Sequence, residues 1–172
     1  MKISADRGIN ARRIPPAWIH FYGESGIGKS TLVETLIDEL VSSGKFDCLK
    51  VHKNDLKYSR SVSDSFWSGY RGQPIVSYDD LYATTGEATA LHAAELISQV
   101  SCETYMPPFA SLADASVGIK GTLYSSKFII STANTAVSTN LKLSHPIALK
   151  RRMLRCIKVL LYDNTVVKEG IS

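Results

Sequence analysis

The stretch GESGIGKST, from Gly23 to Thr31, constrains the fold more than any other part of this 172-residue chain. It fits the pattern G-x-x-x-x-G-K-[S/T], in which backbone N–H groups turn inward around phosphate oxygens. An apolar run precedes it at Ala17–Tyr22, and apolar residues at helical spacing follow it. That context predicts a strand, then a phosphate-binding loop, then a helix whose N-terminus faces the phosphates.

The residues of this loop have distinct expected roles. Lys29 is expected to reach the β- and γ-phosphates, and the Ser30 hydroxyl is expected to ligate Mg²⁺. The whole stretch is expected to contact the nucleotide: Gly23, Glu24, Ser25, Gly26, Ile27, Gly28, Lys29, Ser30 and Thr31. The competing interpretation is a glycine-rich turn with a surface lysine, and the flanking strand and helix argue against it.

Short apolar runs recur along the chain and are expected to form the strands of one sheet. Four follow the first strand, at 48–52 (CLKVH), 74–80 (PIVSYDD), 126–132 (SKFIIST) and 155–162 (RCIKVLLY). Short strands that alternate with helices are typical of parallel sheets. The sequence therefore predicts the α/β class, with a mostly parallel five-stranded sheet flanked by helices, as in P-loop NTPases.

Two amphipathic helices are expected from the spacing of apolar residues. The first follows the phosphate-binding loop and ends at the Ser-Ser-Gly of 42–44. Its expected apolar face consists of Leu32, Val33, Leu36, Ile37 and Leu40. The second helix lies within 87–100, and its expected apolar stripe consists of Leu91, Ala94, Ile97 and Val100.

One compact domain is expected from residue 14 to residue 163, with 1–13 as a loose lead-in and 164–172 as a tail. The chain starts almost on a core strand and stops soon after another, as expected of a piece excised from a longer protein. Its net charge of +4 permits a polyanionic partner without demanding one. No apolar run has the length of a membrane span. The isolated Cys48, Cys102 and Cys156 fit no zinc site or disulfide framework and are expected to be buried free thiols.

Polar side chains at the ends of two expected strands indicate how phosphates and metal would be handled. Asp79 and Asp80 follow the apolar run PIVSY. Adjacent carboxylates repel unless their roles differ, so we expect Asp79 to face Mg²⁺ through water and Asp80 to polarise an attacking water. Asn134, after SKFIISTA, is expected to hold the γ-phosphate or that water. Alone, such residues are more typical of turns and caps, and the phosphate-binding loop favours the functional interpretation.

A pair of arginines, Arg151 and Arg152, stands in ALKRRML just before the last apolar run. Arginine is rarely buried unless it is paired. The pair is therefore either a solvated basic turn or the partner of a negative charge.

The order of these motifs resembles that of superfamily 3 helicases, and in particular the 2C-like ATPase/helicase of picorna-like RNA viruses. The resemblance rests on GESGIGKS, QPIVSYDDL, PPFASLADASVGIKG, SKFIISTAN and ALKRRM, which follow one another as Walker A, Walker B, an intervening loop, motif C and an arginine finger. The stretch FWSGYRGQP at 66–74 is also similar to that family. The resemblance extends over about residues 18–160.

The resemblance implies an AAA+-like, Mg²⁺-dependent ATPase that assembles into a ring, usually a hexamer, with ATP at each interface. Arg151 and Arg152 would then project into the neighbouring subunit's nucleotide site. The loop that contains Lys120 would line the central channel, with Lys120 on an RNA phosphate and Tyr124 close by for base stacking. Such a motor would act in viral genome replication, in the host-cell cytoplasm at membrane-associated complexes, and would attach to membranes only through segments absent here.

Three other functions remain open at this stage. A remodelling or encapsidation ATPase would share these motifs without unwinding RNA. A small P-loop nucleotide kinase would need an arginine-rich lid and an acceptor-site motif, which we do not find. A non-enzymatic RNA-binding module would leave the phosphate-binding loop unexplained.

Overall fold

The computed structural model describes residues 12–44, 55–61, 63–83, 87–109, 122–137 and 147–161. Within these ranges, five parallel strands form one sheet in the order β2-β3-β4-β1-β5. The elements are β1 (Ala17–Tyr22), α1 (Lys29–Ser42), β2 (Lys57–Arg60), β3 (Ile75–Tyr78), α2 (Glu87–Gln99), β4 (Phe128–Ala133), α4 (Ile147–Lys150) and β5 (Arg155–Lys158). The expected α/β class with a parallel sheet is confirmed.

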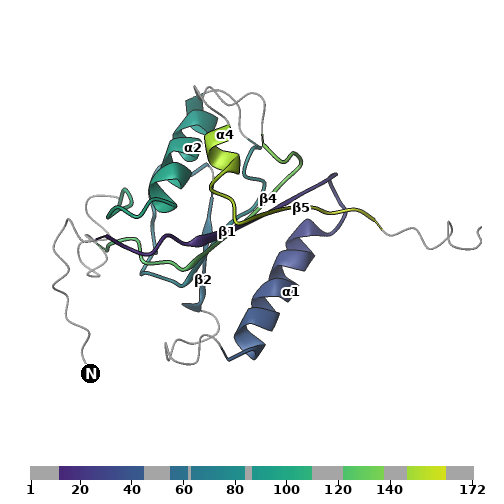
Figure 1. Ribbon diagram of the computed structural model, residues 1–172, viewed down its shortest axis with the longest axis horizontal. Helices are drawn as coiled ribbons and strands as arrows, with labels where there is room; N and C mark the ends of the chain where they lie inside the picture. Colours follow the sequence, from purple (N-terminus) through teal and green to yellow (C-terminus); the bar gives the residue numbers. More distant parts are fainter. Residues whose placement is uncertain are drawn as a thin grey trace, which may run out of the picture.

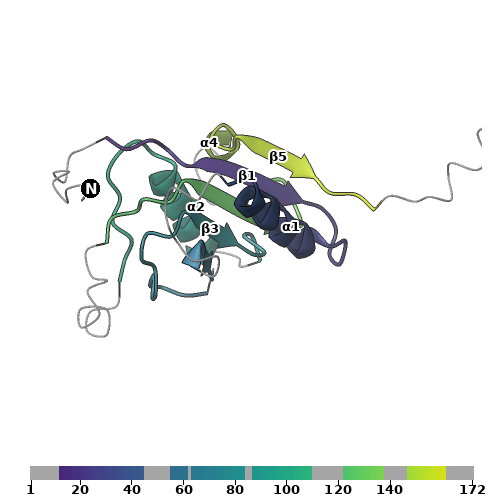
Figure 2. The same cartoon turned by 90° about the horizontal axis from the view of Figure 1, so that it is seen from below.

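The sheet lies between two helical layers. Helix α1 covers one face, and α2 and α4 cover the other (Figure 1). The view from below shows the strands side by side with α1 in front of them (Figure 2). The larger apolar core lies on the α2 side and includes Trp18, Leu96 and Leu149. The smaller core lies under α1 and includes Phe21 and Ile37.

The strand order determines which loops meet. Strand β1 pairs with β4 on one side and with β5 on the other, and β3 is the next strand beyond β4. In a parallel sheet all carboxyl ends lie at one edge, where open α/β sheets bind their ligands. The phosphate-binding loop after β1, the acidic pair after β3 and Asn134 after β4 therefore gather at that edge.

Strand β2 was not predicted, because its sequence, KYSR, is polar. The structure shows why it is nevertheless a strand: its side chains alternate between layers. Lys57 forms an ion pair with Glu34 of α1, whereas Arg60 is 3% exposed and pairs with Glu95 of α2. The strand expected at 48–52 lies outside the described residues. The three later strands are found where they were expected, but each is shorter than its apolar run.

The predicted apolar stripe of α2 is only partly right, because Val100 is buried and Ile97 packs against the core, but Leu91 and Ala94 are exposed. Leu91 is 65% exposed, whereas the buried side chains include Ala93, Leu96 and two polar residues, His92 and Gln99. A stripe drawn from apolar residues alone misses polar residues that find partners inside. On α1 the prediction is better, since Val33 and Ile37 are buried.

Two expectations about individual residues also change. Cys102 is exposed and Cys156 is half-buried, both as free thiols, so the expectation of buried thiols fails for Cys102. Cys48 lies outside the described residues.

Arg13, which was expected to belong to a loose lead-in, is held in place, because its guanidinium donates to the carbonyls of Ser98, Gln99 and Glu103 at the end of α2. No helix of the described residues is long and apolar enough to cross a membrane.

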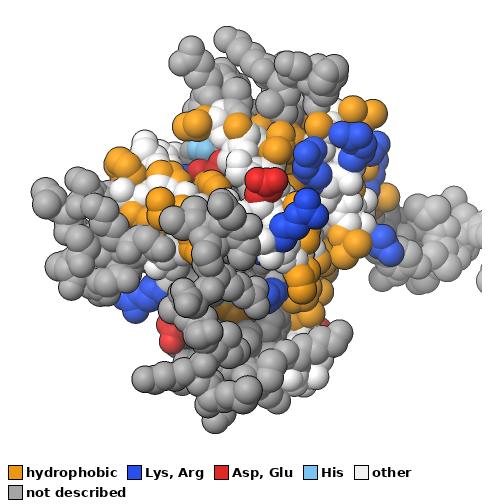
Figure 3. All heavy atoms as spheres, turned by 60° about the vertical axis from the view of Figure 1, so that its left-hand side comes forward, with side chains coloured by type: hydrophobic (Ala, Val, Ile, Leu, Met, Phe, Trp, Pro, Cys, Tyr) orange, Lys and Arg blue, Asp and Glu red, His pale blue; other side chains and the backbone are white. Residues whose placement is uncertain are grey.

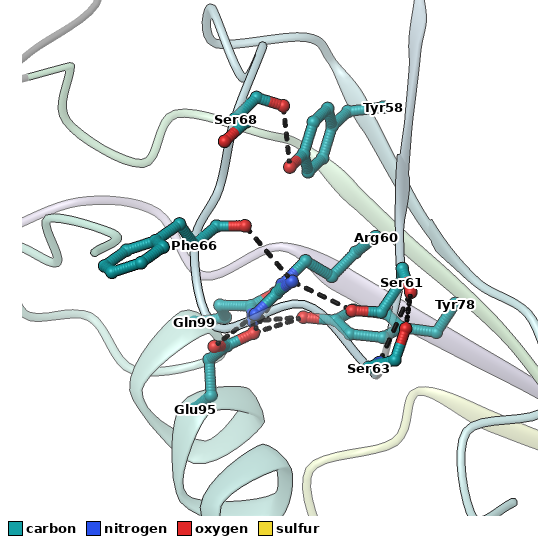
Figure 4. A network of polar contacts seen from close by, with 9 residues as sticks. All are labelled: Tyr58, Arg60, Ser61, Ser63, Phe66, Ser68, Tyr78, Glu95 and Gln99. Carbon is teal, nitrogen blue, oxygen red and sulfur yellow. Dashed lines mark hydrogen bonds and ion pairs between the residues drawn. The ribbon is translucent and has the colours of Figure 1, made fainter. Parts of the chain in front are cut away.

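A buried ion pair joins the end of β2 to α2 (Figure 4). Arg60 Nη2 lies 3.2 Å from Glu95 Oε2, and the side chains are 2% and 9% exposed. Arg60 Nη1 also donates to the carbonyls of Ser61 and Phe66, at 2.8 and 3.4 Å. Burial opposes the positive charge, but the hydrogen bonds and charge of Glu95 outweigh it, so the pKa of Arg60 is raised. Arg60 therefore links the backbone at Ser61 and Phe66 to Glu95 of α2.

Removing one member of this pair should destabilise the fold strongly. We expect Glu95→Ala to lower the free energy of unfolding by about 3–5 kcal/mol, since it leaves the Arg60 charge buried without a counter-charge. The matched control is Glu34→Ala, which breaks the exposed pair with Lys57 and should cost at most about 1 kcal/mol. Urea unfolding of both variants measures the difference, and equal costs would contradict this account of the Arg60 pair.

Candidate active site

The phosphate-binding loop begins where β1 ends between its two neighbours. Gly23 N donates to Ala133 O of β4 at 3.2 Å, and Val159 N, just after β5, donates to Tyr22 O at 2.7 Å. A Cβ atom on Gly23 would lie 2.5 Å from Val159 O and 2.5 Å from Ile27 Cδ1. Only glycine allows this approach of the loop to the β5 backbone.

Between Gly23 and α1, the loop contains two glycines in the left-handed backbone conformation. Gly26 has φ 80° and Gly28 has φ 84°, values that L side chains adopt at a cost. Gly28 is the N-cap of α1 and supplies no side-chain acceptor. The first turn of α1 therefore presents its N–H groups and positive dipole end to the loop, as an anion site requires.

Lys29 connects the loop to the end of β4. Its Nζ donates to Gly23 O at 2.9 Å, to Glu24 O at 2.7 Å and to Asn134 Oδ1 at 3.0 Å. The side chain is nearly buried, with 7% exposed. Lys29 and Asn134 are 105 positions apart, and both were expected to contact the phosphates. The structure brings their side chains together.

The acidic pair is held by Thr132, a residue that the sequence analysis missed. Thr132 Oγ1 donates to Asp79 Oδ1 at 2.6 Å and accepts from Asp80 N at 3.0 Å. The same Asp79 oxygen accepts from Ser30 Oγ at 3.2 Å. Asp80 has φ 48°, and the side chains of both aspartates are exposed. One carboxylate is therefore oriented toward Ser30, while the other extends from a left-handed turn.

The oxygen atoms of Ser30 and Asp79 have the chemistry of a Mg²⁺ site. Mg²⁺ is usually held by one or two carboxylates together with substrate phosphates and water, rather than by a cage of protein ligands. Within the described ranges, no three or more His, Cys, Asp or Glu side chains form a cluster that could hold a metal. The donor set fits a metal that arrives with a nucleotide.

A groove of about 360 Å³ adjoins this pair of oxygens. It runs between α1 and the carboxyl-terminal parts of β2 and β3. Its lining residues are Ser30, Val33, Glu34, Lys57, Ser59, Arg60, Ser61, Ser77, Tyr78, Asp79 and Thr132. The groove therefore extends the site from the metal ligands toward the β2 edge of the sheet.

A family model described as RNA helicase matches residues 19–135, which include the loop, the acidic pair and Asn134. The chain belongs to the RNA helicase family. This match, together with the viral relatives described next, confirms the expected superfamily 3 helicase region of the picorna-like type.

Viral polyproteins contain segments similar to this helicase chain. It is 34% identical over 146 residues to the RNA1 polyprotein of tobacco ringspot virus, an alignment covering 84% of the chain and 6% of the polyprotein. It is 34% identical over 151 residues to the RNA1 polyprotein of raspberry ringspot virus (strain cherry), covering 87% and 6%. For grapevine chrome mosaic virus the identity is 36% over 129 residues, covering 73% and 5%. The chain thus spans about one twentieth of the length of these relatives.

The arginine pair of this helicase chain lies apart from the cluster of site residues. Arg151 and Arg152 follow α4 and are exposed, and Arg152 Nη1 donates to Ala148 O at 2.9 Å. Among the described residues neither guanidinium has a carboxylate partner. Lys150, Arg155 and Lys158 on α4 and β5 are exposed as well, and Figure 3 shows basic side chains gathered on one part of the surface.

One of the two expected RNA contacts needs correction. Tyr124 is 2% exposed, with its ring stacked on Tyr70 and a centroid 5.9 Å from that of Trp67. The Arg13 guanidinium also lies over this ring, 5.0 Å from its centroid. A ring held in this way has no face left for a base. Lys120, the other expected contact, lies outside the described residues.

Proposed function

We propose that this chain is the Mg²⁺-dependent, ATP-hydrolysing motor of a viral RNA helicase used in genome replication. The observation that carries the proposal is the convergence of Lys29, Ser30, Asp79 and Asn134 at the carboxyl ends of β1, β3 and β4. A phosphate-binding loop alone would fit any P-loop protein. The acidic pair and the β4 amide beside it supply what hydrolysis needs in addition.

Each residue has a task in the proposed reaction. The loop N–H groups and Lys29 bind and orient the β- and γ-phosphates. Ser30 and Asp79 hold Mg²⁺, which when bound neutralises phosphate charge. Asp80, whose carboxylate has no hydrogen-bond partner among the described residues, polarises the attacking water, and Asn134 holds that water or the γ-phosphate. This division agrees with the different surroundings of the two aspartates.

Assembly and partners form a second part of the proposal. The subunits form a ring, with six as the expected number, in which Arg151 and Arg152 of one copy reach the nucleotide of the next. This would give the exposed basic pair the counter-charge that it lacks within its own chain. RNA is the polyanion on which the motor acts, with Lys120 as an expected phosphate contact. The site of action is the host-cell cytoplasm, with any membrane attachment coming from other segments of a polyprotein.

The decisive experiment is to measure phosphate release from ATP, with and without Mg²⁺ and with and without single-stranded RNA. Mg²⁺-dependent release that RNA stimulates supports the motor. Release that RNA does not change would favour a remodelling ATPase without unwinding. Transfer of phosphate to a nucleotide acceptor would indicate a kinase, and the absence of any turnover would contradict the proposal.

Thr132 provides a sharper test of how the metal ligand is held. We expect Thr132→Val, which keeps the shape but removes the hydroxyl, to lower turnover about 10–100-fold and to raise the Mg²⁺ concentration needed for half-maximal activity. Thr132→Ser keeps the hydroxyl and should stay close to wild type. A Mg²⁺ titration of hydrolysis measures both, and equal behaviour of the two variants would rule out the orienting role.

A further inference from the structure

A fully buried histidine lies beneath the turn that carries Asn134. His20 on β1 is 0% exposed and pairs across the strands with Ser131 of β4, which is also 0% exposed. Both side chains are on the α2 side of the sheet, together with Trp18. Buried polar groups require partners, so their hydrogen bonds can be traced one by one.

For a neutral His20 ring, the hydrogen bonds leave a single consistent placement of the protons. The Thr135 carbonyl can only accept, and it lies 3.2 Å from His20 Nε2, so Nε2 carries the hydrogen. Nδ1 of the neutral ring is then an acceptor, and the Ser131 hydroxyl, 2.8 Å away, donates to it. Trp18 Nε1 donates in turn to Ser131 Oγ at 2.8 Å. The chain of donors therefore runs Trp18, Ser131, His20 and ends on the Thr135 carbonyl.

Aromatic rings hold the imidazole in place. Tyr22 stacks on it with a centroid separation of 6.3 Å, and Tyr82 meets it edge-on at 5.8 Å. Burial lowers the pKa of His20, although its hydrogen bond to Thr135 works in the opposite direction. Burial therefore favours the neutral ring, in which Nε2 donates to Thr135 O and Nδ1 accepts from Ser131.

The last acceptor of this hydrogen-bond relay, which runs from Trp18 through Ser131 and His20 to the Thr135 carbonyl, adjoins the candidate site. Thr135 directly follows Asn134, whose Oδ1 accepts the hydrogen bond from Lys29 at 3.0 Å. The backbone of the turn is therefore held from below by His20, while its amide side chain faces the phosphate-binding loop. Displacing a reacting group by about 1 Å can cost about 100-fold in rate, so the anchor of this turn matters to the chemistry.

We propose that His20 is a positioning residue, whose Nε2–H holds the Thr135 carbonyl and thereby fixes the Asn134 amide beside the phosphates. The inference rests on the proposed ATP hydrolysis and adds to it a residue that touches neither nucleotide nor metal. A histidine with only a structural role would stabilise the core whether or not its N–H pointed toward the Thr135 carbonyl. The two roles can be separated, because only the positioning role requires a donor aimed at Thr135.

Two substitutions separate the donor from the rest of the ring. His20→Phe keeps an aromatic ring of similar size but removes both nitrogens. His20→Gln loses the Nδ1 acceptor but retains an amide N–H that can reach Thr135 O. We expect kcat to fall at least about tenfold in His20→Phe, with KM for ATP changed less than about twofold, and to recover largely in His20→Gln. Equal kcat in the two variants, corrected for the folded fraction, would overturn the proposal.

If His20→Phe does not fold, His20→Asn replaces it, since its amide lies near Ser131 and stops short of Thr135. Two measurements do not depend on activity. Nitrogen-15 NMR of the wild-type chain should find Nε2 protonated and Nδ1 unprotonated at neutral pH, and the opposite tautomer would refute the relay. The side-chain amide signals of Asn134 should move in His20→Phe and stay in His20→Gln. A wild-type chain without ATPase activity would contradict the proposed function, while these NMR results would still decide the relay.

Discussion

Lys29→Ala is expected to abolish measurable ATP hydrolysis. Lys29 is nearly buried between the loop carbonyls and Asn134, and within the described residues no other lysine or arginine donates to this cluster. Losing one preorganised donor at a reaction centre typically costs about 10²–10³-fold in rate, and here the lost donor also carries the charge that faces the phosphates. Phosphate release from ATP measures the effect.

The control for this variant is Lys127→Ala. Lys127 is an exposed lysine at the beginning of β4, at the opposite end of that strand from Asn134. The Lys127→Ala substitution changes the net charge by the same amount as Lys29→Ala, and this variant should retain wild-type turnover. Circular dichroism and thermal unfolding verify that both variants fold. Near-normal turnover in folded Lys29→Ala would refute the assignment of the phosphate-binding loop.

Loss of Arg151 and Arg152 is expected to have an equally large effect by a different route. Each alanine variant should bind nucleotide nearly as wild type does, because neither arginine contacts the loop of its own chain in the described structure. Hydrolysis should fall by about 10³–10⁵-fold, the range found when an arginine finger is removed from NTPases. Nucleotide binding and phosphate release, measured on the same samples, separate the two effects.

Mixing two inactive proteins tests whether the arginines act across an interface. Lys29→Ala supplies intact arginines, and the Arg151→Ala, Arg152→Ala double variant supplies an intact loop. In a mixed assembly some interfaces combine both intact halves, so activity should reappear and should rise steeply with protein concentration. Co-assembled mixtures that remain inactive would contradict action in trans, and the pair would then be an ordinary basic turn.

Much of the fold could be predicted because the informative residues are local in sequence. The glycines of GESGIGKST fix their own backbone, and the apolar runs of β1, β3 and β4 are buried on both faces, as parallel strands require. The gathering of Lys29, Asp79 and Asn134 followed from the rule that carboxyl ends of parallel strands meet at one edge. The order of the strands, which makes β1, β4 and β3 neighbours, was not predicted and came from the structure.

The rest depends on side chains that meet only in the folded state. Strand β2 contains no apolar run, since its buried member is Arg60, whose counter-charge is on α2. The buried face of α2 includes Gln99, which donates to the hydroxyl of Tyr78. Tyr124 was expected to contact RNA because of the family resemblance, but its ring is covered by residues more than fifty positions earlier in the sequence. Helical and strand periodicity contain no information about such pairings.

The sequence contained one unused signal for the hydrogen bonds that hold His20 and Asp79. Ser131 and Thr132 are hydroxyl residues in the middle of the otherwise apolar run FIISTA of β4. Successive strand residues face opposite layers, so one hydroxyl was bound to point toward α1 and the other toward α2. Ser131 pairs with His20 of β1, and Thr132 pairs with Asp79 just after β3. Because these partners are distant in sequence, only the structure could identify them.

The position of β1 between β4 and β5 has a consequence for synthesis of the chain. Ala17 pairs with Phe128, and Ile19 pairs with Arg155, so the first strand made must wait for partners about 110 and 135 residues later. At about 5–20 residues per second, this delay is roughly 6–27 s on the ribosome. Throughout it, an apolar strand with two unpaired edges is exposed to aggregation and to chaperones. The loop after β1 reaches its final geometry only when Ala133 and Val159 have emerged, so this candidate site forms late in the folding of the domain, although its loop is translated more than 100 residues before those partners.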